Sequence, residues 1–112
     1  AALVAHVVRQ HADSPVLVVC AGSVGRFNRE DFYGAGHIAS HFETTGAYAL
    51  SDAALAAVLL YRGCAAESAL NASRVGSMMQ AHRLGDEVEH AARLDSVDVV
   101  PELIDGCLRV AA

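Results

Sequence analysis

The residues best suited to chemistry lie in one short segment in the first third of the chain. An apolar run ends at Cys20, and Ala21-Gly22-Ser23-Val24-Gly25-Arg26 then leads into a predicted helix. Glycine lets backbone N–H groups approach an anion closely, and a helix N-terminus adds a favourable dipole. We therefore predict that Gly22, Ser23 and Gly25 contact oxyanion oxygens. Arg26 is predicted to pair with an anionic group.

A simpler interpretation of the same segment is an ordinary connection between a strand and a helix, in which the glycines only give the backbone freedom. The segment matches neither G-x-G-x-x-G nor a Walker A loop, so it gives weak support to nucleotide binding. Cys20 is predicted to be a small core residue rather than a nucleophile. The pattern thus leaves an anion site and a plain turn both open.

Carboxylates follow the glycine segment. Glu30 and Asp31 fall in the first turn of the predicted helix, and Asp52 opens the next one. Mg²⁺ binds through one or two carboxylates, several waters and substrate phosphate oxygens, so these three residues are candidate metal ligands. Asp31 is also the candidate catalytic residue. Helix capping explains Asp31 and Asp52 equally well, because acidic side chains favour the first turn of a helix.

The six histidines suggest metal binding only weakly. His37 and His41 have the i, i+4 spacing of a helical ligand pair, but they are predicted to face away from the apolar side of their helix. Solvent exposure or a subunit contact is therefore expected for both. No constellation is evident among the remaining four, His6, His11, His82 and His90.

Composition excludes several classes of protein. The formal net charge is −5, which disfavours nucleic-acid binding, since phosphate backbones require clustered cations. No apolar stretch reaches the ~18 residues that span a bilayer. The three cysteines are widely spaced and form no C-x-x-C pair, so neither a disulfide framework nor a zinc-finger pattern is present. We predict a cytoplasmic protein that binds no membrane.

The predicted elements are mostly helical. Residues 16–20 form an apolar, β-rich run typical of a parallel strand covered on both faces. Residues 97–100 are a second predicted strand, ended by Pro101, and Asp105-Gly106 predicts a hairpin. Predicted helices cover residues 3–8, 28–42, 51–61 (buried all round), 65–84 (broken near Ser73 or Gly76 and ended by Gly85) and 86–94.

This pattern predicts a helix-rich α/β fold with a small mixed or parallel sheet and flanking helices. A parallel strand at residues 16–20 needs a parallel neighbour, and the sequence offers few candidates. Residues 1–112 are therefore interpreted as one α/β domain, or as a fragment of a larger two-domain α/β protein. The expected partner is either a missing N-terminal half or another subunit in a homo-oligomer.

Ordered blocks of the sequence resemble the 2-phosphosulfolactate phosphatase (ComB) family, specifically its C-terminal half. The segment from Val18 through Gly36 is similar to the family pattern A-G-T-x-G-E-F-S-x-x-D. Later blocks that share the resemblance are residues 50–54, Ser73, Gly76, residues 84–86 and residues 95–101. The resemblance implies hydrolysis of a phosphate monoester on a small 2-phospho acid, with Mg²⁺ as cofactor.

Two departures from the family pattern leave a second hypothesis open. Arg26 stands where the family has Glu, and the N-terminal D-x-x-R-A-T block has no counterpart in these 112 residues. One hypothesis is therefore a Mg²⁺-dependent phosphatase half. The alternative is a degenerate, non-catalytic α/β module that mediates assembly.

Overall fold

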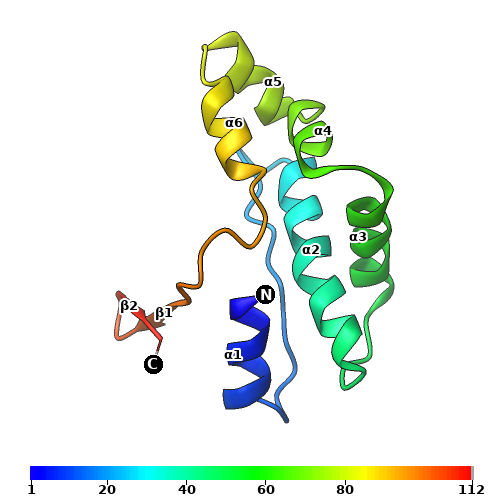
Figure 1. Cartoon of the computed structure of the whole chain (residues 1–112), viewed down its shortest axis with the longest axis vertical. Coiled ribbons are helices and arrows are strands. Elements are labelled where there is room, and N and C mark those ends of the chain that lie inside the picture. Colours follow the sequence, from blue (N-terminus) through cyan, green and yellow to red (C-terminus); the bar gives the residue numbers. More distant parts are fainter. Residues whose placement is uncertain (112) are drawn as a thin grey trace. The chain divides into compact units, whose positions relative to one another are not determined.

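The computed structural model describes residues 1–111 and divides the chain into two compact units. The terminal unit comprises Ala1–Val16 and the residues from Asp95 onward, and the helical unit comprises Leu17–Leu94. In chain order the elements are α1 (Ala2–Gln10), α2 (Arg29–Thr45), α3 (Asp52–Gly63), α4 (Ala66–Asn71), α5 (Arg74–Ala81), α6 (Gly85–Ala91), β1 (Pro101–Ile104) and β2 (Cys107–Val110) (Figure 1).

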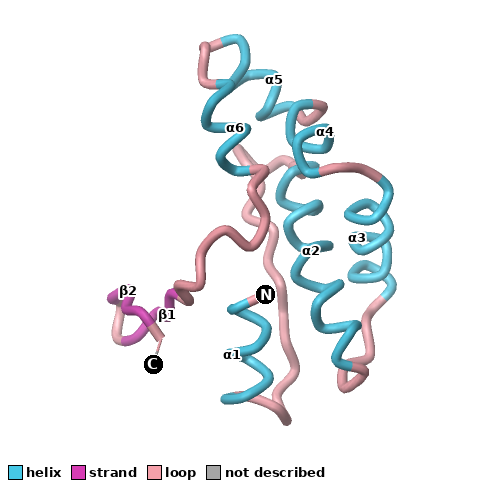
Figure 2. The backbone as a smooth tube through the Cα atoms, viewed as in Figure 1, coloured by secondary structure: helices cyan, strands magenta, loops and turns pink. Residues whose placement is uncertain are grey.

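The predicted fold class is confirmed: the described chain is helix-rich α/β with one small sheet. The parallel strand predicted at residues 16–20 is wrong, because this segment is a loop (Figure 2). Among residues 1–111, the only paired strands are β1 and β2, so residues 16–20 have no hydrogen-bonded neighbour. Cys20, predicted as a core residue, is exposed for the same reason. Strands β1 and β2 pair antiparallel across a tight hairpin, so the sheet is neither mixed nor parallel as predicted.

Helices α2 and α3 form an antiparallel hairpin that contains most of the core of the helical unit (Figure 1). The pair packs closely at Gly36, where an added Cβ would lie 2.0 Å from the carbonyl oxygen of Ala57. Tyr33 is 2% exposed, and its hydroxyl donates to the carbonyl of Cys64 at 3.3 Å. Burial raises the pKa of the Tyr33 phenol, and the nearby Tyr61 and Cys64 add to the shift.

Helix α3 differs from its prediction as a helix buried all round. Only Ala57 and Val58 are buried in it, whereas Leu55 and Leu59 are 43% and 71% exposed. The reason is that α3 packs on α2 along one side only within the described unit. Its start is as predicted, because the Ser51 hydroxyl accepts a hydrogen bond from the N–H of Ala54 at 3.3 Å.

The remaining helices of this unit are short. The predicted break falls at Ser73, which is 2% exposed and caps α5 by accepting from the N–H of Gly76 at 2.9 Å. Gly85 was predicted to end a helix, but it begins α6 instead. The preceding turn is closed when the N–H of Leu84 donates to the carbonyl of Met79, so Gly85 is free to start a new helix.

The terminal unit combines α1 with the β1–β2 hairpin. The hairpin turn is as predicted, because Asp105 and Gly106 both have positive φ, 49° and 77°, as a type I′ turn requires. Pro101 was predicted to end a strand at residues 97–100, but it begins β1, a position where its missing N–H removes no ladder bond. Among the described residues of this unit, those that are buried are Val4, His6 and Val100.

No helix within residues 1–111 combines the length and the apolar character that crossing a bilayer requires.

Candidate functional site

The glycine segment folds into a tight turn at the start of the helical unit. Ser23 and Arg26 exchange backbone hydrogen bonds of 3.2 and 3.0 Å. Between them, Val24 and Gly25 have φ of 52° and 67°, which defines a type I′-like turn. A β-branched residue at positive φ is strained, and such strain is concentrated at functional sites. The turn is therefore held by its surroundings rather than by the preference of Val24.

Asp31 ties this turn to the first turn of α2. Its Oδ2 accepts a 2.7 Å hydrogen bond from the backbone N–H of Gly22. Gly22 has φ of 68°, and an added Cβ would lie 2.5 Å from the carbonyl oxygen of Arg26, so only glycine fits here. This bond holds the Asp31 carboxylate next to the residue that precedes Ser23. Asn28 makes no side-chain capping bond at the start of this helix, and the Asp31 carboxylate is directed to the loop.

Arg74 brings a cation to the same turn from the start of α5. Its Nη2 donates to Oδ1 of Asn28 at 2.7 Å and also contacts the hydroxyl of Ser23. The Ser23 hydroxyl in turn donates to Oδ1 of Asn28 at 3.1 Å. Sequence reasoning missed Arg74, which lies 51 positions from Ser23. One local signal was available, because Arg74 directly follows the N-cap Ser73 and the first turn of α5 contains no acidic residue.

The turn leaves specific donors available for a ligand. The N–H groups of Gly22 and Ser23 are already bonded, to Asp31 and to the carbonyl of Arg26. In contrast, no hydrogen bond among residues 1–111 involves the N–H of Val24 or Gly25. Arg74 donates to Ser23 and to Asn28 through Nη2 alone, and a guanidinium carries five N–H donors. An oxyanion therefore has free turn N–H groups and free Arg74 guanidinium donors beside the same exposed turn.

The predicted phosphate-binding residues occupy different positions in this arrangement. Ser23 lies in the hydrogen-bonded cluster, and Gly25 lies at the tip of the turn. Arg26 is exposed, and its hydrogen bonds in the turn are made by its backbone. Its guanidinium therefore lies outside the cluster formed by Ser23, Asn28 and Arg74, and its pairing with an anion stays a prediction.

One observation supports a divalent-cation site at the acidic residues that begin α2. Glu30 Oε2 is buried and has no hydrogen-bond partner among the described residues. A buried carboxylate oxygen without a partner is costly, and a cation supplies what it lacks. Glu30 is adjacent to Asp31 in the first turn of α2, and Asp31 Oδ1 is not used in the bond to Gly22. Oxygen donors of this kind suit Mg²⁺.

Asp52 is not brought to this group. Among the described residues, the three predicted carboxylates do not form a set whose ligand atoms lie within 4.8 Å of one another. Gly36 packs against Ala57, Asp31 lies five residues before Gly36, and the helices are antiparallel. Asp52 is therefore displaced from Asp31 by about 15 Å along the hairpin, at a rise of about 1.5 Å per residue. We therefore leave Asp52 out of the proposed site. Its role as a metal ligand stays a prediction.

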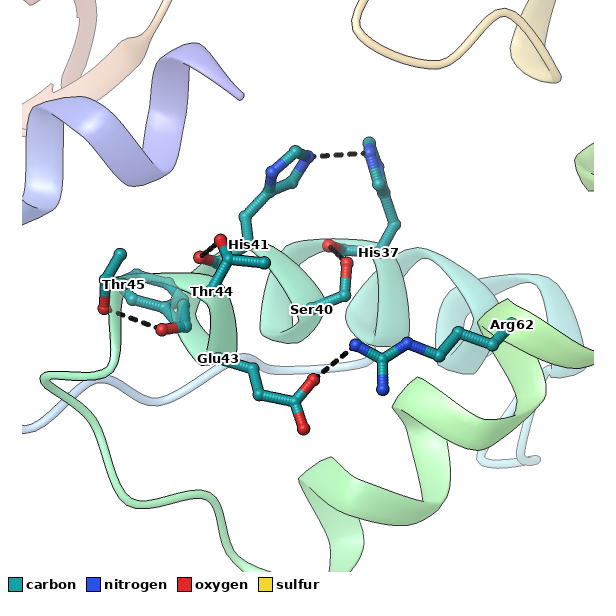
Figure 3. A network of polar contacts seen from close by, with 8 residues as sticks. His37, Ser40, His41, Glu43, Thr44, Thr45 and Arg62 are labelled. Atoms are coloured by element: carbon teal, nitrogen blue, oxygen red, sulfur yellow. Dashed lines mark hydrogen bonds and ion pairs between the residues drawn. The ribbon is translucent and has the colours of Figure 1, made fainter.

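His37 and His41 project from α2 with their rings toward each other (Figure 3). Both side chains are half-buried. His37 and His41 have ring nitrogens 3.1 Å apart, and the His37 ring lies 5.1 Å from the ring of Tyr61. Farther along, Arg62 donates to Glu43 at 2.6 Å and links α3 to α2. Both histidine side chains are therefore partly buried, and His37 also contacts Tyr61 of α3.

These observations define a helix-rich α/β protein with an exposed turn suited to an oxyanion. The family model described as 2-phosphosulpholactate phosphatase matches residues 1–106, so the chain belongs to this family. The resemblance drawn from the ordered sequence blocks is confirmed.

Two curated relatives carry the same description. A probable 2-phosphosulfolactate phosphatase of Deinococcus radiodurans is 35% identical over 112 residues, covering 95% of this chain and 47% of the relative. A second, from Carboxydothermus hydrogenoformans, is 34% identical over 87 residues, covering 78% and 37%. The chain thus spans less than half the length of these relatives. No solved structure matches it.

Proposed function

We propose that this chain supplies one half of a Mg²⁺-dependent phosphatase that hydrolyses 2-phosphosulfolactate or a related small 2-phospho acid. The observation that carries the proposal is the meeting of the Arg74 guanidinium and the Ser23 hydroxyl at the strained turn, directly before an acidic helix start. Family membership and the names of the two relatives support the substrate class. The remaining contacts for catalysis come from sequence beyond this chain.

The turn and Arg74 bind the phosphate in this proposal. The N–H groups of Val24 and Gly25 donate to phosphate oxygens, and the free donors of Arg74 bind them in the forked geometry that suits phosphate. The Ser23 hydroxyl adds a further hydrogen bond. A 2-phospho acid carries at least one more anionic group, and the exposed Arg26 is the candidate to pair with it. These contacts hold the phosphorus in position for attack by water.

Glu30 and Asp31 are the proposed Mg²⁺ ligands, directly or through water. When bound, Mg²⁺ neutralises phosphate charge and stabilises the charge that develops on the leaving oxygen. Asp31 has a second task in this chain, because its bond to Gly22 keeps the turn next to the helix start. The Asp31 carboxylate thereby links the position of the bound phosphate to the position of the proposed Mg²⁺ ligands.

Phosphate release by the gene product that contains this chain tests the proposal. The assay uses a panel of 2-phospho acids with and without Mg²⁺, and compares Asp31→Asn with the unchanged protein. Asparagine still accepts the Gly22 N–H but removes the charge, so we expect kcat/KM in Mg²⁺ to fall at least about tenfold, or ~1.4 kcal/mol in transition-state free energy.

Asp52→Asn is the matched control. It makes the same change in the first turn of α3, at the other end of the helix pair, and should leave turnover and its Mg²⁺ dependence unaltered. Equal turnover and equal Mg²⁺ dependence in Asp31→Asn and the unchanged protein would remove Asp31 and the metal from the proposed site.

We also propose that the chain associates with a second copy of itself or with its missing N-terminal half, and that it works in the cytoplasm. The supporting observation is the unpaired apolar segment that precedes the turn, in which Leu17 and Val19 are 85% and 76% exposed. Surface of this kind favours burial against a neighbouring chain. We propose neither a nucleic-acid nor a membrane partner, in keeping with the net charge of −5.

A further inference from the structure

The terminal unit contains a buried histidine paired with a carboxylate. His6 lies in α1 and is 7% exposed, and its Nε2 lies 2.7 Å from Oε1 of Glu102 in β1. The two residues are 96 positions apart in the chain. The contact therefore joins the first helix to the terminal hairpin through side chains that are both potential metal ligands.

A second histidine completes the group. His11 follows the last turn of α1 and is exposed, and its ring lies 6.3 Å from the ring of His6 at an interplanar angle of 63°. One ligand atom from each of His6, His11 and Glu102 lies within 4.8 Å of the others. The prediction that His6 and His11 belong to no constellation is therefore wrong. Their shared partner, Glu102, lies near the other end of the sequence. Motif spacing does not predict contacts between residues that are so far apart in the chain.

We propose that His6, His11 and Glu102 form a Zn²⁺ site separate from the phosphate-binding turn. Two imidazole nitrogens and one carboxylate are the donor set of many zinc centres, with a fourth position left to water. Imidazole ligands favour Zn²⁺ over Mg²⁺, which prefers oxygen donors only. The proposed ion is therefore chemically distinct from the one assigned to Glu30 and Asp31, and the two sites are tested independently.

The distances suit this ion after small side-chain movements. Ligand atoms about 2.0 Å from a tetrahedral Zn²⁺ lie about 3.3 Å from one another. The separation between His6 and Glu102 is 2.7 Å, and the largest in the group is no more than 4.8 Å. His11 is exposed and can rotate toward the buried His6, so the separations need to change by at most about 1.5 Å, mainly through movement of His11.

A bound ion would fasten α1 to β1. Both elements are short, and the described unit buries only a few side chains. A ligand that binds the folded unit and not the unfolded chain raises its stability, and ligands from distant positions close a long loop. Zn²⁺ should therefore raise the thermal midpoint of the terminal unit, a readout that does not depend on phosphatase activity.

The test is Zn²⁺ binding by the protein, measured in competition with a chromophoric chelator, with Co²⁺ as a spectroscopic substitute. We expect one ion per chain at this site. His11→Gln removes an exposed ligand without disturbing the buried pair, and should weaken Zn²⁺ binding at least about tenfold, since even loss of outer-shell partners costs that much. It should also abolish the Zn²⁺-induced rise in thermal midpoint. Glu102→Gln should give the same result.

Two controls separate this site from other histidines. His82→Gln changes an exposed histidine of the helical unit and should leave Zn²⁺ affinity unaltered. His37→Gln disrupts the i, i+4 histidine pair of α2, which is the main alternative Zn²⁺ site. This variant should also leave Zn²⁺ affinity unaltered. The proposal is overturned if the unchanged protein binds no Zn²⁺, or if His11→Gln binds it as tightly as the unchanged protein.

Discussion

At the scale of single residues, the guanidinium of Arg74 distinguishes this turn from an ordinary connection. An exposed turn needs no cation, yet Arg74 reaches back to both Ser23 and Asn28 from a different helix. Asn28 is 6% exposed and accepts from both of its partners through one oxygen. The cluster therefore holds the guanidinium beside the turn before any ligand arrives, which reduces the entropic cost of binding.

Removing this guanidinium should impair substrate use more than stability. We expect Arg74→Ala in the full gene product to lower kcat/KM at least about tenfold, because a charge-assisted bond to phosphate is lost. Arg74→Lys should recover only part of the activity, since an ammonium lacks the forked geometry. Steady-state phosphate release measures both effects.

Arg93→Ala is the matched control for the Arg74 variants. Arg93 is an exposed arginine of the same unit, and it should be replaceable without effect. If Arg74→Ala and Arg93→Ala have the same kcat/KM, the guanidinium of Arg74 takes no part in binding the substrate.

At the scale of elements, the position of the turn depends on the close packing of α2 against α3. Gly36 lies where the two backbones meet, and a Cβ there would lie 2.0 Å from the Ala57 carbonyl oxygen and 3.0 Å from Cβ of Tyr61. Backbone atoms cannot yield to such a contact without moving the helices apart. Glu30 and Asp31 lie on α2, so a shift of this helix also moves the proposed Mg²⁺ ligands.

Gly36→Ala should therefore destabilise the helical unit by about 1–3 kcal/mol, the usual cost of overpacking a core. Gly34→Ala is the internal control, since nothing lies within 4 Å of an added Cβ at that position. Alanine is the better helix former, so Gly34→Ala should stabilise by up to about 1 kcal/mol. Urea unfolding of both variants measures the difference, and equal midpoints would mean that the two helices are not in close contact at Gly36.

The segment before the turn is the element that departs most from its prediction. Leu17 and Val19 are strongly exposed, whereas Val16 and Val18 are 39% and 37% exposed. This alternation is the period of a strand, although no ladder forms within the described residues. The sequence pattern is therefore that of a strand, and no segment pairs with it among residues 1–111.

At the scale of the whole molecule, this exposed alternating segment predicts self-association. A double change of Leu17 and Val19 to Lys places charge on the exposed side and should reduce association, as charged edge residues do in natural sheets. Sedimentation velocity across a concentration series measures the effect.

Leu59→Lys is the control for association. Leu59 is 71% exposed, but it lies on α3, where the backbone groups are already bonded within the helix. Its replacement should leave association unaltered. A chain that is monomeric at all concentrations, or a double variant that associates as strongly as the unchanged chain, would contradict self-association through this segment and leave the N-terminal half as its proposed partner.

The sequence by itself determined the family and the local features that depend on near neighbours. The starts of α3 and α5 follow from Ser51 and Ser73, whose hydroxyls accept N–H groups three residues ahead. The hairpin follows from Asp105-Gly106. The nearness of Ser23 and Asp31 was also predictable, since a turn and the adjoining helix start lie within a few residues of each other.

Only the tertiary structure decided the contacts between residues distant in the chain. Arg74 reaches the turn, His6 meets Glu102, and Asp52 is carried away from Asp31, and no local pattern specifies any of these. The physical reason is that capping and turn formation are set by φ, ψ and hydrogen bonds within a few residues, whereas these pairings depend on how whole helices pack. Strand formation at residues 16–20 also depends on tertiary structure, because a strand forms a hydrogen-bonded ladder only with a neighbouring strand.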